Sequence, residues 1–278
     1  MHTVNGFTFE SSEKTLRKTD DVLAGTSYRF EFDNEEEELY SFLTATDLVR
    51  ANRDQEFRWE KYGCLKMDDH TFFVSFEVFG RLVRECVTLV FDTESRLVTR
   101  IVTQSGYLPE RRRMSRTDVQ FGAIYMNGLP LPEDRHGFTD DLFGTCITWT
   151  YSTGFVNTHL YLDGCYRTHT VRNPDEAGIL STGPADKLEP LYEEPAQYIR
   201  IRDGLYLCSF IEENMNLRDA TKGGNNLILL IDTGRGMDAG RIFNYTPDLQ
   251  PRWGLFRAYG VRGKADFPGA TDPGPFRT

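Results

Sequence analysis

Three short segments occur twice in the sequence, in the same order, and this repetition restricts the possible folds more than any other feature. The distance between the two copies grows along the chain, so the second copy carries insertions, chiefly around Asn173–Pro195. Ordered repeats predict an internal duplication in which each copy forms one structural unit. The repeated pairs are Leu-x-Gly-Thr at 23–26 and 142–145, TFFVSF at 71–76 with LYLCSF at 205–210, and VTLVFDT at 87–93 with LILLIDT at 227–233.

Each copy has the residue pattern of successive β-strands. Ile147, Trp149 and Tyr151 fall on one face of their segment and the intervening residues on the other, which is the period-two alternation of a strand. Asp203-Gly204 is a turn pair of the kind that joins antiparallel strands. No window of a dozen residues shows a convincing helical period. The sequence therefore predicts strands joined by short turns.

A meander of antiparallel strands has two open edges, and closing the meander into a barrel removes them. We therefore predict an all-β protein that consists of two fused up-and-down antiparallel β-barrels. Residues 1–105 are assigned to an N-terminal barrel, 106–140 to a connecting segment, and 141–278 to a C-terminal barrel with a candidate ligand pocket. A barrel of this size is either filled by side chains or holds one small ligand.

The composition favours a packed cytoplasmic protein. The 278-residue chain is 39% hydrophobic, and its first residues lack the pattern of a secretion signal. A span of about 20 apolar residues, which would be needed to cross a bilayer, does not occur. The formal net charge of −10 repels nucleic acid, and the five cysteines have no CxxC spacing. We expect no nucleic-acid partner, no membrane association and no metal.

The second copy carries more polar and aromatic side chains on one face of its strands than the first. The first copy has phenylalanine at the positions of Trp149 and Tyr151, and Val78 at the position of Glu212. A carboxyl among aromatic rings has a raised pKa and can act as a general acid or base, although each such residue can equally be structural. The residues assigned to this face are Trp149, Tyr151, Asn157, His159, Tyr161, Arg167, His169, Tyr206, Cys208, Phe210 and Glu212.

The sequence resembles the MoaF-like proteins over roughly Val22–Pro247. The resemblance is carried by LAGTSYRFEF, FFVSF and RECVTLVFDT in the first half, and by GTCITWTYSTGFVNTHLY, DGLYLCSF, LLIDT and GRIFNY in the second. It implies that each half is a calycin-type β-barrel, the class that includes the lipocalins. It implies no particular reaction.

The second half also resembles, more distantly, the phenolic acid decarboxylases, which are single small barrels that work without a cofactor. Their Tyr-Thr-Tyr strand falls on WTY at 149–151, and their Ser-aromatic-x-Glu pattern falls on Ser209–Glu212. The resemblance implies that Tyr151 and Glu212 are catalytic. Trp149 replaces the other tyrosine, and the arginine-bearing loop has no clear counterpart, although Arg167 and Arg172 are candidate substitutes.

We favour the hypothesis of a cofactor-independent lyase, isomerase or cyclase that acts on an aromatic or polyketide-like compound. Glu212 would transfer a proton and Tyr151 would hydrogen-bond the developing oxyanion. The alternative is a non-catalytic, lipocalin-like protein that binds or senses a small aromatic or amine ligand. Either way the expected partner is a small hydrophobic or aromatic molecule, and a homodimer is compatible with the sequence but not required. The expected substrate-binding residues are Trp149, His159, Tyr161, Arg167, His169, Tyr206 and Phe210.

Overall fold

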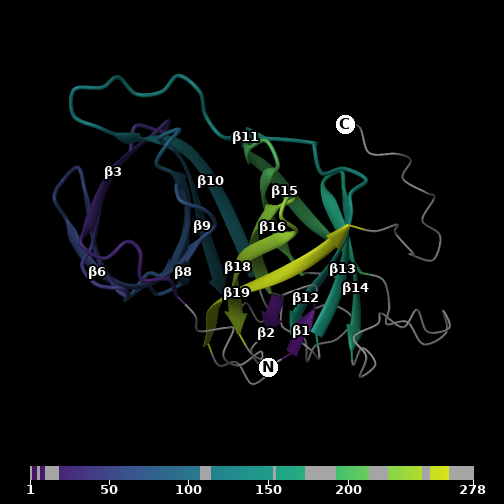
Figure 1. The fold of residues 1–278 in the computed structure, drawn as a ribbon. Helices are drawn as coiled ribbons and strands as arrows, with labels where there is room; N and C mark the ends of the chain where they lie inside the picture. Colours follow the sequence, from purple (N-terminus) through teal and green to yellow (C-terminus); the bar gives the residue numbers. More distant parts are fainter. Residues whose placement is uncertain are drawn as a thin grey trace.

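All of the regular elements in the described part of the chain are β-strands, which confirms the prediction of an all-β protein. Most belong to two large antiparallel sheets that lie side by side, one closed and one curled (Figure 1). A separate small sheet pairs β1 (His2–Val4) with β2 (Phe7–Phe9). No helix in the described residues is long and apolar enough to span a bilayer. The computed structural model describes residues 2–4, 7–9, 19–106, 114–152, 155–172, 192–212, 225–245 and 251–262.

The first large sheet, called the closed barrel below, is a meander of eight strands in which β10 pairs with both β9 and β3. Figure 1 shows it end-on as a ring. Closure gives every strand two neighbours and leaves no open edge. Its strands are β3 (Thr26–Phe32), β4 (Glu37–Phe42), β5 (Asp47–Asn52), β6 (Phe57–Lys66), β7 (Thr71–Glu77), β8 (Arg84–Asp92), β9 (Leu97–Gly106) and β10 (Met114–Tyr125).

The eighth barrel strand, β10, comes from the segment 106–140 that the sequence pattern assigned to a connector. Its neighbour β9 pairs with it over a long register, from Gly106 opposite Met114 to Leu97 opposite Ala123. The connection to the second sheet therefore begins after Tyr125, and the closed barrel extends beyond residue 105.

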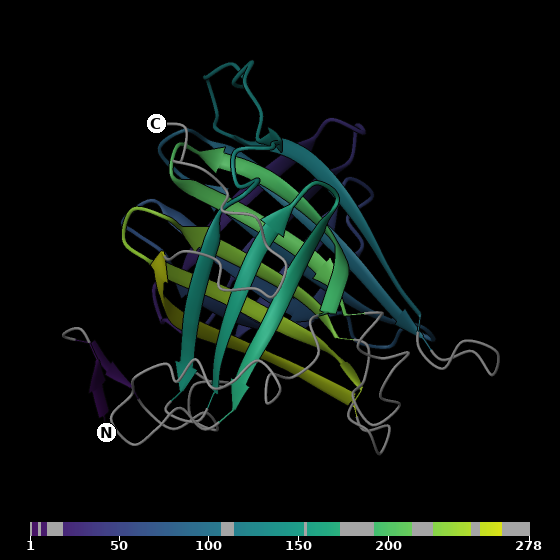
Figure 2. The same ribbon diagram turned by 90° about the vertical axis from the view of Figure 1, so that its right-hand side faces the viewer.

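The second large sheet, called the curled sheet, has nine strands, of which β11 is a two-residue addition. β15 pairs with β14 through Tyr192–Pro195 and with β16 through Ala196–Arg202, so the sheet curls until its ends meet at β15. In Figure 2, the teal strands β12 to β14 cross in front of the green and yellow strands. The strands are β11 (Gly137–Phe138), β12 (Cys146–Ser152), β13 (Phe155–Leu162), β14 (Cys165–Arg172), β15 (Tyr192–Arg202), β16 (Leu205–Ile211), β17 (Asn226–Asp232), β18 (Met237–Tyr245) and β19 (Pro251–Arg262).

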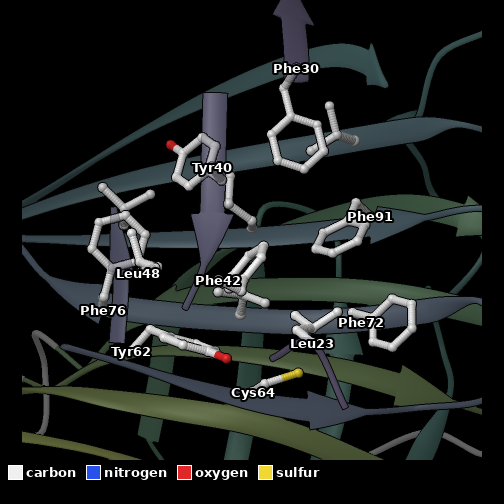
Figure 3. Packing of buried hydrophobic residues seen from close by; sticks show 14 of the residues in the cluster. Leu23, Phe30, Tyr40, Phe42, Leu48, Tyr62, Cys64, Phe72, Phe76 and Phe91 are labelled. Atoms are coloured by element: carbon white, nitrogen blue, oxygen red, sulfur yellow. The ribbon is translucent and has the colours of Figure 1, made fainter. Parts of the chain in front are cut away.

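The interior of the closed barrel is an aromatic core. Phe30 lies 5.4 Å from Tyr40 and 5.3 Å from Phe91, measured between ring centroids. Figure 3 shows these rings pointing toward one another from several strands. Phe42 and Tyr62 form an edge-to-face pair 5.0 Å apart. The inward-pointing side chains of the first copy therefore pack against one another as an apolar core inside the closed barrel.

The two sheets pack against each other through a shared apolar cluster. Phe73, Val90 and Ile101 of the closed barrel belong to the same buried cluster as Leu207 and Leu230 of the curled sheet. Burial of both faces of β17 explains why its sequence, LILLI, is hydrophobic at every position and does not alternate. One face of the strand lines the inside of the curled sheet and the other is buried against the barrel.

Arginines bridge the same interface with hydrogen bonds. Arg241 on β18 is fully buried and donates to the hydroxyl oxygens of Thr88 (3.2 Å) and Thr103 (2.6 Å) on the barrel. Arg202 on β15 donates to Asp92 at 3.0 Å. Because a buried guanidinium loses its hydration, these bonds make the relative position of the two sheets specific.

The repeated segments lie on corresponding strands of the two meanders. The Leu-x-Gly-Thr segments precede or begin β3 and β12, the serine segments form β7 and β16, and the Asp-Thr pairs end β8 and β17. At the Leu-x-Gly-Thr segments, Thr26 N donates to the Leu23 carbonyl and Thr145 N to the Leu142 carbonyl, both at 2.9 Å. The glycine between them has a positive φ in both copies, 80° and 76°.

Candidate functional site

The inner face of the curled sheet combines aromatic rings with buried polar groups. Trp149 on β12 and Tyr161 on β13 are fully buried, and the Trp149 Nε1 donates a 2.9 Å hydrogen bond to the Tyr161 hydroxyl. Trp149 has room because Gly260 lies beneath its ring on β19, where a Cβ atom would come within 2.4 Å of the indole. Both residues lie where period-two alternation predicts them, on the inner face.

His159 lies beside this pair as a neutral side chain. Its Nδ1 is 3.4 Å from the Tyr161 hydroxyl, and its ring stands edge-to-face to Phe210 at 6.1 Å. Burial lowers the pKa of His159 to about 3, because the imidazolium would lose its hydration. His159 therefore offers hydrogen bonding and ring contact, and does not carry a charge at neutral pH.

Asp238 on β18 contributes a buried carboxyl to the site. It is fully buried, and the Tyr151 hydroxyl lies 3.4 Å from its Oδ2, with Tyr151 as the donor. Its other oxygen, Oδ1, is buried and has no hydrogen-bond partner among the residues that the structure describes. Burial raises the pKa of Asp238 to about 7, and hydrogen bonds from the Ala258 backbone and Tyr151 offset this in part. Both protonation states of this carboxyl are therefore accessible near neutral pH.

Tyr151 is held between this carboxyl and a phenyl ring. Its ring lies 5.5 Å from that of Phe256, edge-to-face. Burial, and next the negative charge of Asp238, raise the pKa of Tyr151 well above its usual value, and the charge of Glu212 contributes in the same direction. The phenol therefore stays protonated and acts as a hydrogen-bond donor.

Glu212 follows β16 and is 8% exposed. Its Oε2 accepts a hydrogen bond from the Asn225 side chain, whose own oxygen accepts one from the Asn244 side chain. The backbone N–H of Glu212 also donates to the Asn225 carbonyl, at 2.9 Å. The half-buried Arg252 lies close enough that the charge of Glu212 raises the pKa of that guanidinium, against a larger lowering by burial. Of the two expected catalytic residues, Glu212 thus accepts a hydrogen bond from Asn225, and Tyr151 donates one to Asp238.

Glu194 adds a further buried carboxyl on β15. It is fully buried and lies two residues before Ala196, whose partner on β16 is Phe210. Because alternate residues of a strand share a face, Glu194 belongs to the same inner face as Ala196. The inner face of the curled sheet therefore contains the carboxyls of Glu194, Glu212 and Asp238.

The remaining expected residues fall into two groups. Phe210 is buried and Tyr206 is partly buried, and both pack in the apolar cluster inside the curled sheet. The side chains of Arg167 and His169 lie outside the described residues. Their backbone partners on β13 are Leu160 and Thr158. These two residues lie on the opposite face of β13 from the inner-face positions 157, 159 and 161.

Asp238 was missed by the sequence comparison, although a signal for it exists. The turns after β8 and β17 have the same register, with Asp92 opposite Leu97 and Asp232 opposite Met237. This alignment places Asp238 at the position of Val98, a core residue of the closed barrel. The signal in the sequence is the spacing from the shared Asp-Thr pair, because Val98 follows Asp92 by six residues and Asp238 follows Asp232 by six.

The comparisons with known proteins give no assignment for this site. No protein-family model and no curated protein matches the sequence. Among the described residues, no group of three or more His, Cys, Asp or Glu side chains is arranged to hold a metal ion. The chemistry of the site therefore has to be inferred from its own geometry.

Proposed function

We propose that the curled sheet is the site of a cofactor-independent enzyme that moves a proton on a small aromatic or polyketide-like molecule. The observation that supports this most directly is the buried Asp238 carboxyl. One of its oxygens lies 3.4 Å from the Tyr151 hydroxyl, and the other has no partner within the described part of the chain. A buried acceptor without a partner is uncommon in native proteins, since the loss of its hydration is not compensated. A substrate hydrogen at Oδ1 would supply the missing partner.

In this proposal Asp238 takes a proton from the substrate or returns one to it. The one hydroxyl hydrogen of Tyr151 is donated to Asp238 in the free protein, and in the proposed reaction it turns to the negative charge that develops on a substrate oxygen. Trp149, Tyr161 and Phe210 form the aromatic surroundings of the substrate. Glu212 would bind a polar group of the substrate at the Asn225 side of the site. The reaction is thus a lyase, isomerase or cyclase step that needs no redox change.

Deuterium exchange tests this proposal without knowledge of the natural substrate. The protein is incubated in D₂O with a panel of aryl ketones and β-dicarbonyl compounds, and the compounds are followed by ¹H NMR and mass spectrometry. We expect enzyme-dependent exchange or product formation with at least one of them. Asp238→Asn should reduce this rate about 10²-fold or more, the usual contribution of a positioned acid or base. The matched control is Asp203→Asn, which changes an exposed aspartate in a turn.

Equal rates for wild type and Asp238→Asn would contradict the assignment of the proton transfer to this residue. A saturable thermal shift with an unchanged ligand would favour the second candidate, a protein that binds or senses a small aromatic or amine molecule. The unpartnered Oδ1 of Asp238 supports this candidate too, because an ammonium group can donate to it while aromatic rings add cation–π attraction.

We also infer that the two halves arose by duplication of one calycin-type barrel, as the resemblance to the MoaF-like proteins implies. In support, the repeated segments occupy corresponding strands, and the Leu23–Thr26 and Leu142–Thr145 turns have the same hydrogen bond. The resemblance to the decarboxylases suggests the ligand class but not the reaction. A cytoplasmic location is proposed as well, since the five cysteines of the sequence are odd in number and lack the spacing of a disulfide framework.

A further inference from the structure

Arg84 begins β8 of the closed barrel, and its guanidinium extends to the curled sheet. Glu77 on the neighbouring strand β7 holds it with two hydrogen bonds, of 2.6 and 2.8 Å. The guanidinium lies over the rings of Phe243 (4.5 Å) and Tyr245 (4.8 Å) on β18, measured to the ring centroids. It also donates a hydrogen bond to the backbone carbonyl of Asn244, which lies between them. A residue of the barrel thus fixes the end of β18.

The same asparagine leads to the candidate site. The Asn244 side chain donates to the Asn225 side-chain oxygen, and the Asn225 side chain donates to Glu212 Oε2. Asn244 is 3% exposed, so the hydrogen bond that its side chain donates is shielded from water. Each amide is oriented by the next, because an Asn side chain has one donor end and one acceptor end. A shift of β18 at Asn244 would therefore turn Asn225 and change the bond to Glu212.

We propose that Arg84 is a positioning residue for Glu212, so that the closed barrel determines how this carboxylate is presented inside the curled sheet. The importance of that carboxylate for a ligand rests on the proposed function, but the positioning itself does not. The bidentate pairing with Glu77 is well suited to this task, since it fixes the plane of the guanidinium. Lysine offers a point charge and cannot reproduce that geometry.

Arg202 provides a matched control at the other side of the interface. It too bridges the two sheets, with hydrogen bonds to Thr71 (2.6 Å) and Asp92 (3.0 Å) of the closed barrel. Among the described residues its side chain also bonds to Asp68, and none of its bonds leads to Asn225 or Glu212. Arg84→Gln and Arg202→Gln each remove one guanidinium from the interface, so a general loss of stability should be common to both variants.

The test is an NMR measurement on the intact protein and needs no ligand. The side-chain NH₂ signals of Asn225 are assigned by their loss in Asn225→Ser, and their position without the carboxylate is taken from Glu212→Gln. We expect Arg84→Gln to move these signals toward the Glu212→Gln position, Arg84→Lys to move them part of the way, and Arg202→Gln to leave them in place. If Arg84→Gln does not fold, the Arg84→Lys shift decides.

Unmoved Asn225 signals in both Arg84 variants would overturn the proposal, and so would an equal movement in Arg202→Gln. The outcome is separable from that of the proposed function. Signals that move as expected in a protein without exchange activity would refute the enzyme alone. Activity in wild type together with unmoved signals would refute the positioning role alone.

Discussion

Asp238 and Val98 occupy equivalent positions in the two sheets, and this single difference changes what each interior can do. Val98 packs among aromatic rings in the closed barrel, whereas Asp238 places a carboxyl with one unpartnered oxygen in the curled sheet. Val78 and Glu212 form a second pair of the same kind. Burial of a carboxyl costs stability unless the carboxyl stays protonated or is fully hydrogen-bonded. Buried carboxyls of this kind are therefore typical of functional sites.

The pKa of Asp238 predicts how stability depends on pH. Burial raises this pKa to about 7 in the folded protein, above the ordinary value of 3.8. Between these values the folded state keeps a proton that the unfolded chain releases. The contribution of the carboxyl to stability is therefore complete below about pH 4 and is lost as the pH rises through about 7. Asparagine does not ionise, so Asp238→Asn should gain a few kcal/mol relative to wild type between about pH 5 and pH 8.

Urea unfolding of both proteins at the two pH values measures this gain. The comparison with wild type cancels the opposite effect of His159, whose pKa burial lowers to about 3 and which therefore weakens the fold in acid. A stability difference that does not change with pH would show that the Asp238 carboxyl ionises as it does in water.

At the scale of the element, close packing between neighbouring strands sets the shape of the site. β12 and β19 pair with Trp149 opposite Gly260, and the equivalent pair in the closed barrel is Phe30 opposite Ile124. The larger ring in the curled sheet is matched by a partner without a side chain. The indole can therefore approach β19 closely at Gly260, and its Nε1 donates to the Tyr161 hydroxyl.

This packing predicts the effect of adding one methyl group. In Gly260→Ala the new Cβ would lie 2.4 Å from the indole of Trp149 and 2.7 Å from Ile147, so the ring must move. We expect a loss of about 1–3 kcal/mol, the usual cost of overpacking, and a changed Trp149 fluorescence. The control is Gly137→Ala on β11, where nothing lies within 4 Å of the new Cβ. Equal stability of the two variants would contradict this account.

At the scale of the whole molecule, the shared apolar interface joins the closed barrel and the curled sheet into one folding unit. Leu230 and Ile101 come from different sheets and are both fully buried in the same cluster. The interface also surrounds the buried guanidinium of Arg241, whose pKa burial lowers to about 10. Separating the sheets would expose the apolar cluster to water, and the two halves should therefore unfold together.

The tryptophans allow this to be measured. Trp59 lies on β6 of the barrel and Trp149 on β12 of the curled sheet. Variants that keep one of these two, with Trp253 of β19 replaced as well, report on each half separately. Leu230→Ala should destabilise the protein by about 2–5 kcal/mol, and the two probes should show the same shift of the unfolding midpoint. Leu82→Ala, at a fully exposed position, should have little effect. A shift seen by Trp149 alone would mean that the halves unfold independently.

The sequence by itself determined that each copy forms antiparallel strands joined by turns, and it determined the inner-face positions of Trp149 and Tyr151, because alternation is a local property that each strand carries in its own residues. The tertiary structure alone decided which residues meet. It places Asp238 against Tyr151, Arg84 at the end of β18, and β10 in the closed barrel. These contacts depend on the register and curvature of the sheets and on the interface between them. Such features arise from hydrogen bonds and apolar burial between segments far apart in the chain, which no local pattern records.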